Sequence, residues 1–98
     1  MDARKAADIA ALYEAIVSLE SPEECAHFLD DLCTIQEIDA LSQRWAVARM
    51  LSAGETYQTV LKATGASSTT ISRVNRCLQF GAGGYRGMLA KHGADGGR

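Results

Sequence analysis

The sequence predicts an all-α domain that pairs with a second copy of itself and carries a helix-turn-helix. Apolar residues recur at helical spacing along most of the chain, a glycine divides two short helical segments within residues 56–80, and charge is distributed unevenly. We find no alternating run typical of a strand. A length of 98 residues fits one domain, which we place at residues 1–92, before a flexible tail at 93–98.

Two amphipathic helices are expected before residue 33. In the second, Ser21 offers an N-cap, Pro22 suits the first helical position and Glu24 completes a capping box. Its apolar face runs from Cys25 to Leu32. The first helix, at residues 3–19, has a single apolar stripe formed by Ile9, Leu12, Tyr13, Ile16 and Val17.

A third helix is expected to follow Thr34, which forms another capping box with Glu37, and to end at Gly54. Its apolar residues occupy more than one side, and a lone chain of this size can hardly bury such a helix. We therefore expect a partner subunit to cover part of it. The apolar residues are Ile38, Leu41, Trp45, Val47, Ala48, Met50 and Leu51.

The helix-turn-helix is predicted from capping and apolar spacing. Thr56 caps the first helix, Gly65 ends it in the left-handed conformation, and Ser67 or Ser68 caps a second helix that ends near Phe80. The apolar positions of the pair are structural: Val60, Leu61, Ile71 and Val74.

The remaining face of this segment carries groups suited to DNA. Hydroxyl, amide and guanidinium side chains bond base edges and phosphates in a major groove. A helical hairpin in an ordinary bundle shares the glycine and the apolar spacing, but it does not explain this polar face. The candidate DNA-binding residues are Gln58, Ser67, Ser68, Thr69, Thr70, Ser72, Arg73 and Arg76.

Charge separates the two halves of the chain, although the formal net charge is only -2. Acidic residues dominate residues 1–39, where the only bases are Arg4 and Lys5, whereas Glu55 is the sole acid within residues 40–92. The basic half contains the helix-turn-helix, so one face suits phosphates and the other suits water or partners. Helices that differ only in solvated charge are the alternative explanation.

After Phe80 the glycine-rich stretch of residues 81–84 ends any helix. Because no Lys-Ser or Lys-Thr pair follows it, we interpret it as a hinge and not as a phosphate-binding loop. A last short helix is expected from Tyr85 to Lys91.

Several classes of function are excluded by what the sequence lacks. No cofactor or metal site is expected: Cys25, Cys33 and Cys77 suit reduced core thiols, and His27 has no further zinc ligand at a familiar spacing. We find no carboxylate pair or activated nucleophile, so we expect no enzyme. Neither a membrane span nor a signal peptide is apparent, which predicts a cytoplasmic protein.

Two stretches resemble the Trp repressor superfamily, in its YerC/YecD-type branch. They are ALSQR from Ala40 to Arg44, continuing to Gly54, and GASSTTISR from Gly65 to Arg73. The resemblance implies a six-helix, intertwined all-α homodimer whose two helix-turn-helix heads address successive major grooves of a pseudo-palindromic operator on double-stranded DNA.

The resemblance also implies an effector pocket. Thr34, Arg44 and Arg73 match the family's threonine and arginines, whereas Val74 and Cys77 stand where tryptophan-binding members have glycine and serine. Two added methyl groups and one lost hydroxyl predict a closed slot that does not take tryptophan. Any small-molecule effector is therefore unknown, and Arg44 instead suits a phosphate contact or an interhelical tether.

The resulting prediction is a sequence-specific DNA-binding transcriptional regulator, most simply a repressor, that acts as a homodimer without tryptophan. The alternative is a protein-interaction or structural helical dimer that does not bind an operator.

Overall fold

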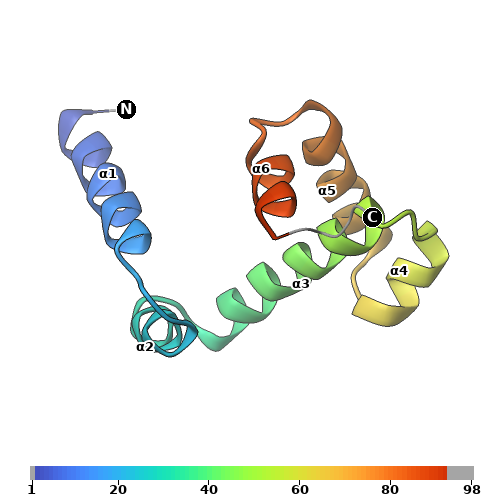
Figure 1. Ribbon diagram of the computed structural model, residues 1–98, viewed down its shortest axis with the longest axis horizontal. Coiled ribbons are helices and arrows are strands. Elements are labelled where there is room, and N and C mark those ends of the chain that lie inside the picture. Colours follow the sequence, from blue (N-terminus) through green and yellow to red (C-terminus); the bar gives the residue numbers. More distant parts are fainter. Residues whose placement is uncertain (1, 93–98) are drawn as a thin grey trace. The chain divides into compact units, whose positions relative to one another are not determined.

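The computed structural model describes residues 2–92, and these form six α-helices and no strand (Figure 1). The all-α prediction is confirmed, whereas the tail predicted at residues 93–98 lies outside the described residues. The chain divides into two compact units, an N-terminal unit from Met1 to Ile38 and a C-terminal unit from Asp39 onward. The helices are α1 (Ala3–Val17), α2 (Pro22–Leu32), α3 (Ile35–Ser52), α4 (Tyr57–Thr64), α5 (Ser68–Phe80) and α6 (Gly84–Lys91).

Helix starts in the N-terminal unit follow the predicted caps. The Ser21 hydroxyl accepts a hydrogen bond from the backbone N–H of Glu24 at 3.0 Å. The Glu24 carboxylate returns to the N–H of Glu20, one residue before the position that a capping box uses. Thr34 and Glu37 form the full reciprocal box, with bonds of 2.8 and 3.1 Å, so α3 begins where the sequence predicts.

The N-terminal unit buries none of its helical side chains. Neither α1 nor α2 contains a buried residue. On the apolar stripe of α1, Tyr13 is 62% exposed and Val17 is 83% exposed. Ile9 and Leu12 of the same stripe are half-buried, so its second half is the part that leaves apolar surface exposed.

The hydrophobic core lies in the C-terminal unit and joins α3, α4 and α5. Its centre consists of fully buried aliphatic side chains, against which Trp45 and Leu78 pack with half-buried surfaces. The buried centre comprises Val47, Ala48, Val60, Ala66, Ile71 and Val74.

The connections of the C-terminal unit match the predicted turn chemistry. Gly54 and Gly65 have φ values of 89° and 72°, the left-handed region that favours glycine at a helix end. Gln43 of α3 donates a hydrogen bond of 3.1 Å to the carbonyl of Thr64, which anchors the end of α4. The turn between α4 and α5 is therefore held both by its own backbone and by α3.

Two predictions about side-chain burial are wrong. Leu61 was expected to be structural with Val60, but it is 44% exposed while Val60 is fully buried, because successive residues point about 100° apart around a helix. Cys77 was expected to be a core thiol, but it is exposed, whereas Cys25 and Cys33 are half-buried.

Candidate nucleic-acid interface and the arginine cavity

The start of α5 is fixed by Ser67. Its hydroxyl oxygen accepts from the backbone N–H of Thr70 at 3.1 Å, and its O–H donates to the hydroxyl oxygen of Thr70, also at 3.1 Å. This bonding satisfies one of the free N–H groups at the helix start. Ser67 therefore acts first as a cap. One lone pair on each of the two hydroxyl oxygens and the Thr70 hydroxyl hydrogen stay available for a ligand.

The side chains of α5 that pack in the core and those that are polar and exposed lie at different positions around the helix. Ile71 and Val74 are 0% and 1% exposed, three residues apart on the side that faces the core. The other candidate positions on this helix are exposed, except that Thr70 is half-buried. The exposed set is Ser68, Thr69, Ser72, Arg73 and Arg76, so this part of the predicted arrangement has the required accessibility.

Gln58 lies in the first turn of α4, next to the N-cap Thr56, whose hydroxyl accepts from the N–H of Thr59 at 3.1 Å. It is exposed and lines a shallow cavity of about 280 Å³ between α4 and α5, together with Ser68. The first turns of α4 and α5 therefore each place a polar side chain, Gln58 and Ser68, at the edge of this cavity. The other lining residues are Tyr57, Leu61, Lys62 and Ile71.

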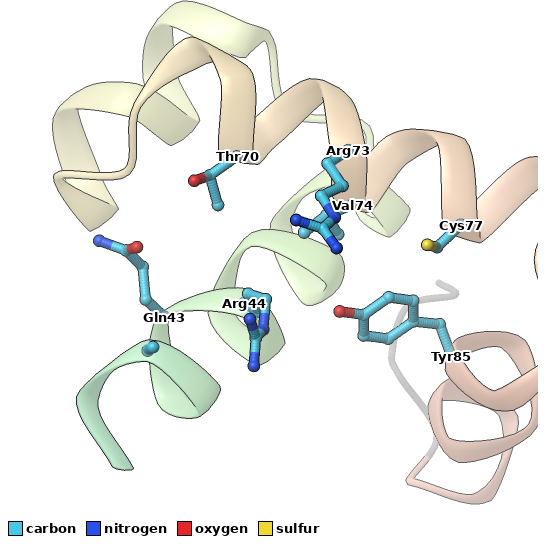
Figure 2. Close-up of a pocket in the computed structure, with 8 residues that line it drawn as sticks. Gln43, Arg44, Thr70, Arg73, Val74, Cys77 and Tyr85 are labelled. Carbon is cyan, nitrogen blue, oxygen red and sulfur yellow. The ribbon is translucent and has the colours of Figure 1, made fainter. Parts of the chain in front are cut away.

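A second cavity lies between α3, α5 and the start of α6, and we call it the arginine cavity. Figure 2 shows the guanidinium groups of Arg44 and Arg73 approaching it from α3 and α5, with the Tyr85 hydroxyl directed toward the space between them. Its volume is about 280 Å³. The lining residues are Ala40, Gln43, Arg44, Thr70, Arg73, Val74, Cys77 and Tyr85.

The charge of this cavity favours anions. Two guanidinium groups line it, and no aspartate or glutamate is among the lining residues. Guanidinium forks bind carboxylate and phosphate oxygens well, whereas an ammonium group would meet two like charges here.

Four of the five predicted pocket residues line the arginine cavity. Thr34 is not among the lining residues. The cavity also remains open next to Val74, contrary to the predicted closed slot, because that side chain is almost wholly within the core. Sequence reasoning missed the four other lining residues, since no local signal places them there: Ala40, Gln43, Thr70 and Tyr85.

Tyr85 is held by an aromatic contact. Its ring stacks on Trp45 of α3, with ring centroids 6.4 Å apart and an interplanar angle of 11°. This contact joins the first turn of α6 to α3 and fixes one wall of the arginine cavity.

Residues 2–92 bring no three histidine, cysteine or acidic side chains together as a metal-binding group. Within the same range, no helix has both the length and the apolar character needed to cross a bilayer.

The comparison with known proteins decides the family. A family model described as Trp repressor protein matches residues 7–93. The chain belongs to the Trp repressor family. This confirms the resemblance read from the third helix and the hairpin, and it places the chain in a family of regulatory, non-enzymatic proteins.

Individual relatives agree with the Trp repressor fold. The chain is 49% identical over 89 residues to the uncharacterized protein YerC of Bacillus subtilis strain 168, covering 91% of this chain and 86% of YerC. A candidate Trp repressor from Staphylococcus aureus has a TM-score of 0.85 at 47% identity, with 94% of each chain covered. A TrpR-like protein from Eubacterium eligens has a TM-score of 0.86 at 45% identity, with 89% of this chain and 90% of that chain covered.

Proposed function

We propose that this Trp repressor family member is a sequence-specific DNA-binding transcriptional regulator that represses promoters as a homodimer on a pseudo-palindromic operator. The observation that carries the proposal is the division of α5, whose Ile71 and Val74 are buried while Thr69, Arg73 and Arg76 are exposed. A helix that packs on one side and presents hydroxyl and guanidinium groups on the other matches the chemistry of major-groove reading.

Roles within this interface follow from each side chain. Thr69 and Ser72 are exposed hydroxyls suited to base edges, and Arg76 is an exposed cation suited to a phosphate. Gln58, at the start of α4, suits a hydrogen bond to a neighbouring phosphate of the DNA backbone. Ser67 and Thr70 contribute mainly by fixing the helix start, since their hydroxyls bond each other.

The proposed homodimer accounts for apolar surface that the single chain leaves exposed. Tyr13 and Val17 on the stripe of α1 are exposed, and Ile35 and Leu41 of α3 are 77% and 46% exposed. A second copy of the chain is the simplest partner for this surface, because a two-fold symmetric dimer brings the same apolar surface of both protomers together. In that dimer, residues 1–92 of each protomer would form one domain around a shared core. The protein would then act in the cytoplasm, where the chromosome lies.

Tryptophan is not the proposed corepressor. The arginine cavity offers two guanidinium groups to a carboxylate but no carboxylate to an ammonium group, and Cys77 supplies a thiol where the tryptophan-binding members have a hydroxyl. Operator binding is therefore proposed to be independent of tryptophan.

Selection of genomic fragments by the purified full-length protein tests the function. We expect one enriched pseudo-palindrome, with binding that weakens steeply as salt rises. Random duplex DNA should bind more weakly with the same kind of salt dependence. Enrichment of no sequence, together with no salt-dependent shift of random duplex, would favour a protein-interaction or structural dimer.

A further inference from the structure

Helix α6 contacts two other helices through consecutive residues. While Tyr85 stacks on Trp45 of α3, the next residue, Arg86, reaches α5. Its Nε donates to the carbonyl of Leu78 at 2.7 Å, and its Nη2 donates to the carbonyl of Gln79 at 3.0 Å. The start of α6 therefore links α3 to the far end of α5.

The C-terminal end of α5 depends on groups from outside the helix. The last four carbonyls of a helix lack intrahelical partners. Here the backbone N–H of Gly81 bonds the carbonyl of Cys77 at 2.9 Å, and Arg86 bonds the next two carbonyls. No basic residue lies in the last turn of α5, so the cation that favours this end of the helix dipole comes from α6.

The glycine-rich connection between the helices brings Arg86 back to α5. A Cβ atom at Gly81 would clash with the carbonyl oxygen of Cys77. Gly83 has a φ of 90°, a conformation that favours glycine. The stretch predicted to be a hinge is a tight reversal with defined hydrogen bonds.

We propose that Arg86 is a positioning residue for operator binding, because it fixes the C-terminal end of α5. This inference rests on the proposed DNA-binding function. The core holds α5 at Ile71 and Val74, and the half-buried Leu78 packs against it. The two carbonyls that Arg86 binds lie four and five residues, or about 6 to 7.5 Å, beyond Val74 along the helix axis. A second attachment at that distance stops α5 from rocking on the core and so keeps Thr69 and Ser72 aligned with base edges. The sequence-specific part of operator affinity, which depends little on salt, therefore depends on Arg86, although Arg86 does not itself contact DNA.

Three variants of the full chain test this proposal. We call the two hydrogen bonds that the Arg86 guanidinium donates to α5 the fork. Arg86→Gln removes both the fork and the charge, whereas Arg86→Lys keeps the charge and loses the fork. Lys91→Gln is the matched control, since it removes the same charge from α6 at an exposed residue outside the bonded end of α5. Affinities for the selected operator and for random duplex are measured over a salt series, well below each variant's melting temperature.

We expect Arg86→Gln to lower operator affinity by about threefold to tenfold, with random-duplex affinity and its salt slope equal to those of the Lys91→Gln control. Arg86→Lys should recover part of the loss, because one ammonium can still bond one carbonyl. In the protein without DNA, amide hydrogen exchange at residues 78–81 should accelerate in Arg86→Gln and not in Lys91→Gln. If Arg86→Gln unfolds at the assay temperature, Arg86→Lys alone tests the fork.

The outcomes separate this proposal from the function on which it rests. If the unmodified protein selects an operator and both Arg86 variants bind it as the control does, the positioning role is overturned and the function stands. A changed random-duplex salt slope would also overturn it, because it would make Arg86 a direct phosphate contact. If the unmodified protein selects no operator, both proposals fail, and the exchange data then report only a local cap.

Discussion

The N-terminal and C-terminal units of this Trp repressor family member differ in where their apolar side chains lie. Every buried hydrophobic residue of the described chain is in the C-terminal unit, from Val47 to Leu89, whereas α1 and α2 bury none. The C-terminal unit therefore has its own core, and the N-terminal unit has capped helices without one. Local caps specify helices, but only a buried apolar face makes a helix stable in water.

Charge follows the same division. The N-terminal unit is acidic and the C-terminal unit is basic, yet the basic residues do not share one role. Arg86 is engaged with the end of α5, while Arg44 and Arg73 line a cavity and Arg76 is exposed. The number of basic residues in the C-terminal unit is therefore larger than the number available to contact a nucleic acid.

The largest expected effect is a truncation in the core of the C-terminal unit. Ile71→Ala should lower the free energy of unfolding by about 2 to 5 kcal/mol, because Ile71 is fully buried and its removal leaves a cavity. Urea unfolding followed by circular dichroism measures this change. A loss below about 1 kcal/mol would mean that the core can collapse around the missing side chain.

The matching truncation in the N-terminal unit is Val17→Ala on α1. In the single chain Val17 is 83% exposed and should contribute little, whereas in the proposed dimer its burial contributes about 1.5 to 3 kcal/mol. We expect the larger value, with a melting temperature that rises with protein concentration. Glu14→Ala, on the same helix, is the polar control. A well-folded monomer in sedimentation at low micromolar concentration would contradict the dimer.

A hydroxyl on the exposed face of α5 should matter for sequence and not for stability. Thr69→Ala is expected to cost about 1 to 3 kcal/mol for the selected operator if Thr69 bonds a base edge. Binding to random duplex should stay unchanged. Ser42→Ala, which removes an exposed hydroxyl from α3, serves as the control in the same shift assay. Equal operator affinity in both variants would place the reading face elsewhere.

Removing a phosphate contact should act on all sequences alike. Arg76→Ala is expected to weaken operator and random duplex together and to reduce the slope of log affinity against log salt by about 1. Arg4→Ala removes the same charge from the acidic unit and should change neither quantity. A reduced slope in Arg4→Ala would show that the N-terminal unit also touches DNA.

The smallest expected effect is that of tryptophan. Titration with L-tryptophan at millimolar concentration should give no saturable heat in calorimetry, because the two guanidinium groups of the arginine cavity repel an ammonium group and no carboxylate among the lining residues balances them. Cys77→Ser restores a hydroxyl at an exposed lining residue and is the variant in which weak binding would return. A saturable isotherm for the unmodified protein, with tighter operator binding, would contradict this prediction.

The sequence by itself determined the six helices and their ends to within two residues. Caps at Ser21, Thr34 and Thr56, and the left-handed Gly65, depend on atoms within four residues of one another and appear in the structure where they were predicted. For α5 the structure selects Ser67 from the two predicted caps, Ser67 and Ser68. The buried face of α5 was equally readable from its spacing. These features are local, so residue order alone specifies them.

Only the tertiary structure decided which residues meet across helices. The bond from Gln43 to Thr64, the stack of Trp45 on Tyr85 and the reach of Arg86 to Leu78 join positions that share no spacing pattern. The exposure of Leu61 and Cys77 and the open cavity next to Val74 were misjudged for the same reason. A side chain's burial depends on the direction in which a whole helix packs, and that direction is set by the sum of its contacts with other helices.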